Sequence, residues 1–189
     1  MQYIKDIIRK SISVKESIIN DDYLIETIKI VSGLIENCFK HGGKVLLCGN
    51  GGSAADAQHI AAEFSGRFYF DREPLFAEAL HVNTSYLTAV ANDYSFDEVY
   101  ARLIRAMGKE YDVLIAFSTS GNSNNIIKAV ETANSMNMRT VAFTGESGGK
   151  LKDIVHYLIN VPSKDTPRIQ ESHIMIGHII CELVEKSIF

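Results

Sequence analysis

The sequence predicts an α/β fold: a three-layer α/β/α sandwich with a central parallel sheet of about five strands, preceded by an N-terminal helical hairpin. Short, wholly apolar runs begin after Lys44, and each is followed by a loop and a helical pattern. This alternation is typical of a parallel sheet that is covered on both faces. With 189 residues, 46% of them hydrophobic, the chain has the length of one domain. We expect residues 1–42 to form helices that pack on the core and at an oligomer interface, and residues 43–189 to form the α/β core with its C-terminal helix.

Two amphipathic helices precede the first predicted strand. Isoleucines at helical spacing, set among charged residues, predict the first helix over 3–19. A second apolar pattern runs from Leu24 to Cys38 and stops at Gly42 and Gly43, as is typical of a helix end. We expect the two helices to form a hairpin that packs on the core or on another subunit.

The first strand and the helix after it carry the clearest local signals. Residues 45–48 form a strand of the buried kind, and a glycine-rich turn then leads into a helix from Ser53 to about Gly66. Ser53 followed by Asp56 resembles a capping box, with Asp in place of the usual Glu. This pattern predicts a side-chain cap at the start of the helix.

The later elements alternate in the same way. The remaining strands are predicted, in chain order, at 76–82, which is the weakest, and at 113–117, 140–143 and 157–161. The remaining helices are predicted over 85–91, from Ser95 (capped with Glu98) to near Gly108, after the loop 118–123, and from Pro167 to about Lys186.

The charge balance and the cysteines exclude several protein classes. The chain has 19 basic and 23 acidic residues, a net charge of −4, which argues against non-specific nucleic-acid binding. No apolar run approaches the ~18–20 residues that span a bilayer, and the N-terminus is typical of an amphipathic helix rather than a signal peptide. The widely spaced Cys38, Cys48 and Cys181 fit a reduced compartment. We therefore expect a cytoplasmic protein with no nucleic-acid or membrane partner. The net charge does not argue against binding of a small anionic ligand.

Two loops at the carboxyl ends of predicted strands are candidate ligand sites. Residues 49–53 let the backbone approach a ligand, and residues 118–123 supply four hydroxyls around one glycine; each loop ends at a helix start. Free amides at a helix start suit a phosphate, and hydroxyls add donors without adding charge. A plain glycine turn is the alternative for the first loop. Capping and a turn account for one or two hydroxyls of the second loop, but not for four.

The first loop also matches a dinucleotide-binding fingerprint, Gly49-x-Gly51-x-x-Ala54. That fingerprint requires an acidic residue about 20 positions further on, at the end of the second strand. The weak second strand instead ends near residues 81–83, His-Val-Asn. A dinucleotide would also leave the hydroxyl-rich loop without a role, so we favour a small phosphorylated ligand.

Two histidines lie near other possible ligands for a divalent metal. His59 and Glu63 are four residues apart in one predicted helix, and Gln170 and His178 lie within about 80° of each other on the last helix. Together they offer two imidazoles, a carboxylate and an amide oxygen, a set suited to zinc. The alternatives are a surface His–Glu pair and a histidine satisfied in the core. The cysteines lack C-x-x-C spacing and are expected to be buried hydrophobes. We expect the remaining histidines to be structural: His41, His81, His156 and His173.

A series of motifs in fixed order resembles one known family. The series is Cys48-Gly49-Asn50-Gly51-Gly52-Ser53, Asp56-Ala57-Gln58-His59, Glu63, Gly66-Arg67, Asn92-Asp93, Ser118-Thr119-Ser120-Gly121-Asn122-Ser123 and Arg168-Ile169-Gln170-Glu171. It resembles the sugar isomerase (SIS) domain family and, within it, the phosphoheptose isomerases. The resemblance covers almost the whole chain, and the motifs are specific in combination.

The resemblance implies a SIS fold and a metal-dependent aldose–ketose isomerase. Such an enzyme converts D-sedoheptulose 7-phosphate into D-glycero-D-manno-heptose 7-phosphate through an enediol(ate). This is the first step of bacterial nucleotide-activated heptose biosynthesis, which supplies the lipopolysaccharide core, a capsule or another glycan. The resemblance also implies a cytoplasmic homotetramer with active sites between subunits and one Zn²⁺ in each subunit.

The resemblance further implies roles for individual residues. The zinc ligands would be His59, Glu63, Gln170 and His178. The phosphate would lie against Ser118, Thr119, Ser120 and Ser123, with Ser53 nearby. The sugar would be held by Asn50, Gly51, Gly52, Asn92 and Asp93, and Glu63 and Gln170 would also contact the substrate.

Glu63 and His178 are the candidate catalytic pair. Isomerisation needs a base that moves a proton between neighbouring carbons and a group that handles the oxygens; we expect Glu63 to be the base and His178 the partner acid. Some members of the family have an acidic residue directly before the residue that corresponds to Arg168. This chain has Pro167 there, and its nearest acidic residue is Asp165. We therefore assign no role to an acid at position 167. The rival is a non-catalytic SIS protein that binds the bacterial replication initiator or a phosphosugar. Because such a protein need not retain both members of the pair, we favour the enzyme.

Overall fold

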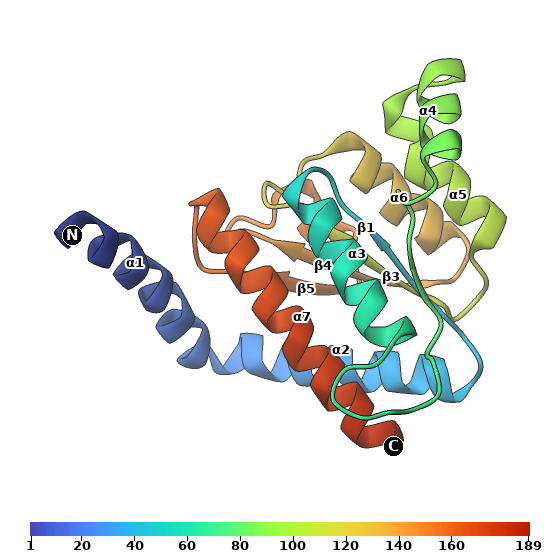
Figure 1. Cartoon of the computed structure of the whole chain (residues 1–189). Coiled ribbons are helices and arrows are strands. Elements are labelled where there is room, and N and C mark those ends of the chain that lie inside the picture. The colour runs from blue at the N-terminus through green and yellow to red at the C-terminus, as the bar shows by residue number, and fades with distance from the viewer.

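A five-stranded parallel sheet forms the centre of the molecule (Figure 1). The computed structural model describes all 189 residues. The strand order is β2-β1-β3-β4-β5, and every neighbouring pair is parallel, which confirms the predicted sheet. The strands are β1 (Val45–Cys48), β2 (Ala77–Ala79), β3 (Val113–Phe117), β4 (Arg139–Thr144) and β5 (Tyr157–Asn160).

Helices cover both faces of the sheet, because successive strand residues point to opposite sides. Val45 and Leu47 of β1 belong to one buried core, which packs against α2, α3 and α7. Leu46 and Cys48 belong to a second core, which packs against α5 and α6. The three-layer sandwich is therefore confirmed. The helices are α1 (Gln2–Ile19), α2 (Asp22–Lys40), α3 (Gly52–Ser65), α4 (Thr84–Asp93), η1 (Phe96–Glu98), α5 (Val99–Met107), α6 (Asn124–Ser135), η2 (Gly149–Asp153) and α7 (Thr166–Ile188).

β1 and β3 are neighbours in the sheet, although β2 lies between them in the sequence. The chain leaves β1 toward one edge to form β2, and then builds β3, β4 and β5 on the other side of β1. The loops that follow β1 and β3 therefore diverge at the carboxyl ends of their strands, a topological switch point at which α/β proteins bind ligands. Both predicted ligand loops, 49–53 and 118–123, lie at this point.

Two local predictions differ from the structure. Ser53 does not cap α3, because the helix already begins at Gly52 and Ser53 is buried within its first turn. The N-cap residue is Gly51, which has a φ of 57°; glycine adopts this left-handed backbone without the steric penalty of a Cβ atom. The strand predicted at 76–82 is shortened to β2, an edge strand that pairs only with β1.

The two predicted N-terminal helices are present, but they do not fold back on each other. α2 packs along α7 and buries residues such as Ile28 and Val31. α1 buries only Ile18 and extends away from the body of the molecule (Figure 1). The predicted hairpin is therefore open, because the apolar face of α1 has no complete partner within this chain. The exposed isoleucines of this face include Ile4, Ile8 and Ile12.

Three further features bear on the sequence predictions. Pro167 lies in the first turn of α7, where its missing N–H costs the helix no hydrogen bond. Cys38, Cys48 and Cys181 are free and buried, and burial raises the pKa of the Cys38 thiol to about 11. No helix combines the length and the apolar character that a membrane crossing requires.

Candidate active site

The loops after β1 and β3 are tied together by a pair of amide side chains. Asn50 Nδ2 donates to Asn125 Oδ1 at 2.8 Å, and Asn125 Nδ2 donates back to Asn50 Oδ1 at 2.9 Å. Asn50 precedes α3, whereas Asn125 is buried in the first turn of α6. The two reciprocal hydrogen bonds fix the loops, and hence the N-termini of the two helices, relative to each other.

Each loop has a glycine where the chain passes close to another segment. A Cβ atom on Gly49 would lie 2.4 Å from the Ser53 carbonyl oxygen, and one on Gly121 would lie 2.1 Å from the Gly148 carbonyl oxygen. Gly121 also has a left-handed φ of 66°. The buried Tyr100 hydroxyl donates to the carbonyl of Gly49. These contacts fix the backbone path of both loops.

The hydroxyl groups of the second loop surround the start of α6. Ser118 Oγ and Ser123 Oγ lie 3.2 Å apart, and Ser120 Oγ accepts a hydrogen bond from the Asn122 amide at 3.2 Å. Ser123 is the N-cap residue of α6, yet its side chain makes no capping hydrogen bond. Thr119 and Ser120 line a cavity of about 360 Å³. Helix capping therefore does not account for these hydroxyls, which lie at the positive end of α6, where an anion is favoured.

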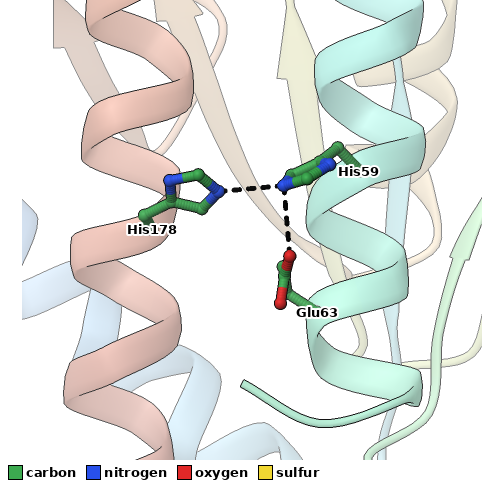
Figure 2. Close-up of side chains that lie close together, drawn as sticks. All are labelled: His59, Glu63 and His178. Carbon is green, nitrogen blue, oxygen red and sulfur yellow. Dashed lines mark hydrogen bonds and ion pairs between the residues drawn. The ribbon is translucent and has the colours of Figure 1, made fainter. Parts of the chain in front are cut away.

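Three side chains that could hold a metal ion, called the metal-binding cluster below, meet between α3 and α7 (Figure 2). His59 Nε2 lies 3.0 Å from His178 Nε2 and 3.1 Å from Glu63 Oε1, and the ligand atoms of the three residues all lie within 4.8 Å of one another. Tetrahedral zinc, with bonds of ~2.0–2.1 Å, separates its ligand atoms by roughly 3.3 Å. Both the spacing and the donor set therefore fit zinc. The side chains of His59 and Glu63 are 51% and 23% exposed, so the cluster is open to solvent on one side.

Close packing of α3 and α7 brings these side chains together. His59 and Glu63 are one helical turn apart and share a face of α3. A Cβ atom on Gly177 of α7 would lie only 2.6 Å from Ile60 Cδ1 of α3. Because Gly177 precedes His178 and Ile60 follows His59, the missing side chain lets the two helices approach at the level of the cluster.

Comparison with known proteins identifies the family. The SIS domain family matches residues 8–145. The phosphoheptose isomerase of Aneurinibacillus thermoaerophilus is 54% identical over 187 residues, which cover 99% of this chain and 94% of that protein. The phosphoheptose isomerase of Clostridium acetobutylicum is 51% identical over 187 residues, which cover 99% of this chain and 95% of that protein. The solved structure of phosphoheptose isomerase GmhA from Neisseria gonorrhoeae has a TM-score of 0.92 to this chain at 41% identity, covering 98% of each. The chain belongs to the phosphoheptose isomerase family of SIS-domain proteins.

Gln170, the fourth zinc ligand that the phosphoheptose isomerase pattern implies, lies apart from the other three. Its side chain packs over Gly52, since a Cβ atom there would be 2.6 Å from Gln170 Nε2. Gly52 precedes His59 by seven residues, which is about 10 Å along α3. Within one chain, the structure therefore places Gln170 beside the glycine-rich loop and brings His59, Glu63 and His178 together.

Asn92 and Asp93, which the phosphoheptose isomerase pattern assigns to sugar binding, lie at the end of α4. Both are exposed, and Asn92 Nδ2 donates to Asp93 Oδ1 at 2.9 Å. α4 packs on η1 and α5 and projects from the body, away from α3 and α7 (Figure 1). Within one chain, these two residues lie away from the metal-binding cluster.

The four histidines that were predicted to be structural lie outside the cluster. His41 Nδ1 pairs with the Asn37 carbonyl oxygen at 2.8 Å, and His156 Nδ1 pairs with Thr140 Oγ1 at 2.7 Å. His173 is fully buried in α7. Burial lowers the pKa of His81, which favours its neutral form.

Four residues around the site have surroundings that the sequence did not indicate. Phe68 packs on His178, with ring centroids 5.8 Å apart. Asp56 has one buried carboxylate oxygen without a hydrogen-bond partner, and burial raises its pKa to about 6. Asn125 and Tyr100 hold the two loops, as described above. Only Asn125 had a usable signal, its place in the first turn after the hydroxyl loop; the other contacts depend on tertiary packing.

Proposed function

We propose that the protein is an aldose–ketose isomerase that converts D-sedoheptulose 7-phosphate into D-glycero-D-manno-heptose 7-phosphate. The observation that carries this proposal is the cluster of His59, Glu63 and His178 in a chain 54% identical to a phosphoheptose isomerase over nearly its full length. The cluster combines a general base and an imidazole at a solvent-open position, the groups that an isomerisation through an enediol(ate) requires.

Glu63 is the base in this proposal. Its carboxylate takes the proton from the carbon beside the carbonyl and returns it to the neighbouring carbon, which moves the carbonyl between C2 and C1. Because Oε1 lies against His59, we assign proton transfer to the other oxygen, Oε2. His178 gives a proton to the carbonyl oxygen and takes one from the neighbouring hydroxyl. Because its Nε2 faces His59 in the cluster, we assign this exchange to the other ring nitrogen, Nδ1. The protons on carbon and on oxygen therefore balance over one turnover.

We assign the ligation of zinc to His59, Glu63 and His178, with Gln170 as the fourth ligand. Imidazole nitrogens and a carboxylate oxygen that face one point are a donor set that zinc favours. A zinc ion held there would supply Lewis acidity, which would polarise the sugar oxygens and favour the negative charge that develops on them. The position of Gln170 beside Gly52 agrees with an active site that another subunit completes.

The glycine-rich and hydroxyl-rich loops hold the substrate in this proposal. Ser118, Thr119, Ser120 and Ser123 bind the phosphate at the N-terminus of α6, with Ser53 nearby at the N-terminus of α3. Asn50, Gly51 and Gly52 bind the sugar, together with Asn92 and Asp93. A site built from hydroxyls, amides and helix ends needs few cations, in keeping with the net charge of −4.

We further propose that the chain acts as a cytoplasmic homotetramer with active sites between subunits. The exposed isoleucines of α1 support this assembly, because apolar faces of this kind mark protein interfaces. A neighbouring apolar groove of about 410 Å³ also supports it. The apolar residues that line this groove are Ile18, Ile19, Ile25, Ile28, Met175, Ile179 and Leu183.

The proposed activity is tested by incubating the protein with sedoheptulose 7-phosphate and following the sugar signals by NMR, with and without a metal chelator. We expect turnover that the chelator abolishes and added Zn²⁺ restores. The Glu63→Gln variant should keep its fold by circular dichroism and lose turnover. No turnover across several divalent metals would refute the enzyme and favour the non-catalytic SIS protein instead.

A further inference from the structure

A buried ion pair joins α7 to the segment that follows α3. Arg72 Nε donates to Glu185 Oε1 at 2.7 Å, and the two side chains are only 2% and 1% exposed. The same carboxylate accepts hydrogen bonds from three consecutive backbone amides at 3.1, 2.7 and 3.1 Å. These amides belong to Phe68, Tyr69 and Phe70. Glu185 therefore holds the whole segment against α7.

The guanidinium of Arg72 reaches the end of α3. Arg72 Nη2 donates to the carbonyl of Glu63 at 3.0 Å, and Nη1 donates to the carbonyl of Phe64 at 3.0 Å. Carbonyls in the last turn of a helix have no partner within the helix, so these two bonds anchor the final turn of α3. Glu63 is thus held through its own main chain by a residue paired to α7.

The clamped segment also contacts the cluster from the α7 side. The ring of Phe68, whose amide is bound by Glu185, lies 5.8 Å from the ring of His178 between centroids. His178 and Glu185 are seven residues apart on α7, two turns, and so share the face that packs on α3. The Arg72–Glu185 pair therefore has a chain of contacts to Glu63 on one helix and to His178 on the other.

We propose that Arg72 and Glu185 are positioning residues that set the separation of α3 and α7 at the metal-binding cluster. A buried ion pair often adds little to stability compared with an apolar replacement, and its best-attested use is to fix one packing arrangement. Every hydrogen bond of this pair goes to α3, to α7 or to the segment between them. The effect on catalysis rests on the proposed function, whereas the effect on metal binding does not.

The test uses Glu185→Gln and Arg72→Lys in the full-length protein. Gln keeps the shape of Glu185 without its charge, and Lys keeps the charge of Arg72 without the fork that binds the α3 carbonyls. Zn²⁺ affinity is measured by calorimetric titration of the chelator-stripped protein, and kcat and KM are measured with sedoheptulose 7-phosphate. We expect Zn²⁺ to bind about 10–100-fold more weakly to both variants, as for other residues that orient metal ligands, and kcat to fall more than KM changes.

The matched control is Asp112→Asn, which disrupts the other buried ion pair of the molecule. Lys44 Nζ and Asp112 Oδ2 lie 2.6 Å apart, and this pair makes no contact with α3 or α7 among its hydrogen bonds. We expect Asp112→Asn to lower the melting temperature and to leave Zn²⁺ affinity and kcat within about twofold of the parent, since its effect is on stability alone.

Three outcomes would overturn the proposal: unchanged Zn²⁺ affinity in folded Arg72→Lys and Glu185→Gln, an equal loss of affinity in Asp112→Asn, or no Zn²⁺ binding by the parent. If Glu185→Gln does not fold, Arg72→Lys alone decides, because it retains the buried charge pair. A parent that binds Zn²⁺ but does not turn over the sugar would refute the proposed function. In that case the Zn²⁺ titrations still decide whether the pair positions the ligands.

Discussion

The surroundings of His173 make the stability of the folded protein sensitive to acid. The side chain is fully buried, with the rings of Phe117 and Phe143 at centroid distances of 5.9 and 5.6 Å. Its Nε2 donates to the Thr144 carbonyl at 3.0 Å, whereas the buried Nδ1 has no partner. A second ring proton would therefore be placed on a nitrogen with no acceptor nearby.

Burial lowers the pKa of His173 from 6.5 to about 4. The unfolded chain consequently binds the proton more readily than the folded protein, and stability rises with pH between these values. The neutral ring contributes fully to the stability of the folded protein above pH 6.5, and this contribution is lost as the pH falls toward the pKa of His173 in the folded state. The difference between the two pKa values corresponds to about 3 kcal/mol of unfolding free energy in total, of which about 2 kcal/mol is already lost near pH 5.

The assay is urea unfolding of the metal-free protein at about pH 7.5 and about pH 5, with His173→Gln as the reference. Gln offers an N–H donor for the Thr144 carbonyl and does not titrate. We expect the unfolding free energy of the parent to fall by about 2 kcal/mol more than that of the variant over this interval. Other titrating groups are present in both proteins and cancel in the comparison. If the unfolding free energies of the parent and the variant changed equally with pH, burial of His173 would not disfavour its protonated form as we infer.

Three further predictions concern the loops and the α1 face. Ser120→Ala should raise KM for the phosphorylated sugar about tenfold, because a hydrogen bond to a charged group is lost; equal turnover of unphosphorylated heptulose by the parent would remove the phosphate assignment. Asn125→Leu should lower the urea unfolding free energy by about 1–3 kcal/mol, because both hydrogen bonds of the half-buried Asn50 amide are lost; an unchanged midpoint would contradict the pairing. Ile8→Glu should shift the sedimentation coefficient toward smaller species, because a charge replaces an apolar contact; an unchanged value would place the interface elsewhere.

The sheet could be predicted from the sequence because its strands are apolar on both faces and each is followed by a loop and a helix. β2 was the exception: it is an edge strand of three residues whose middle residue is Glu78. The start of α3 was misjudged at Ser53, since the left-handed backbone of Gly51 begins the helix earlier than side-chain capping rules predict.

The candidate site could be predicted only in part. Spacing places His59 and Glu63 on one face of a helix, but it does not say that His178, more than a hundred residues later, faces them. The residue types suggested that pairing as one possible zinc set and the family resemblance implied it, and the structure adds its physical cause in the close approach at Gly177. The Arg72–Glu185 pair had no local signal, because the two residues are 113 positions apart and each is an ordinary charged residue in its own segment.

The amide pair that joins the two loops contains a residue that is open to deamidation whenever its loop loosens. Asn50 is followed by Gly51, and a glycine on the C-terminal side offers little steric hindrance to attack of its main-chain nitrogen on the Asn side chain. Loss of ammonia and hydrolysis would leave a carboxylate at position 50, which accepts hydrogen bonds but cannot donate one. Asn125 Oδ1 would then face an oxygen instead of a donor. Deamidation of Asn50 would weaken the tie between the loops 49–53 and 118–123, so protein that has aged under conditions that loosen these loops should lose activity as position 50 gains negative charge.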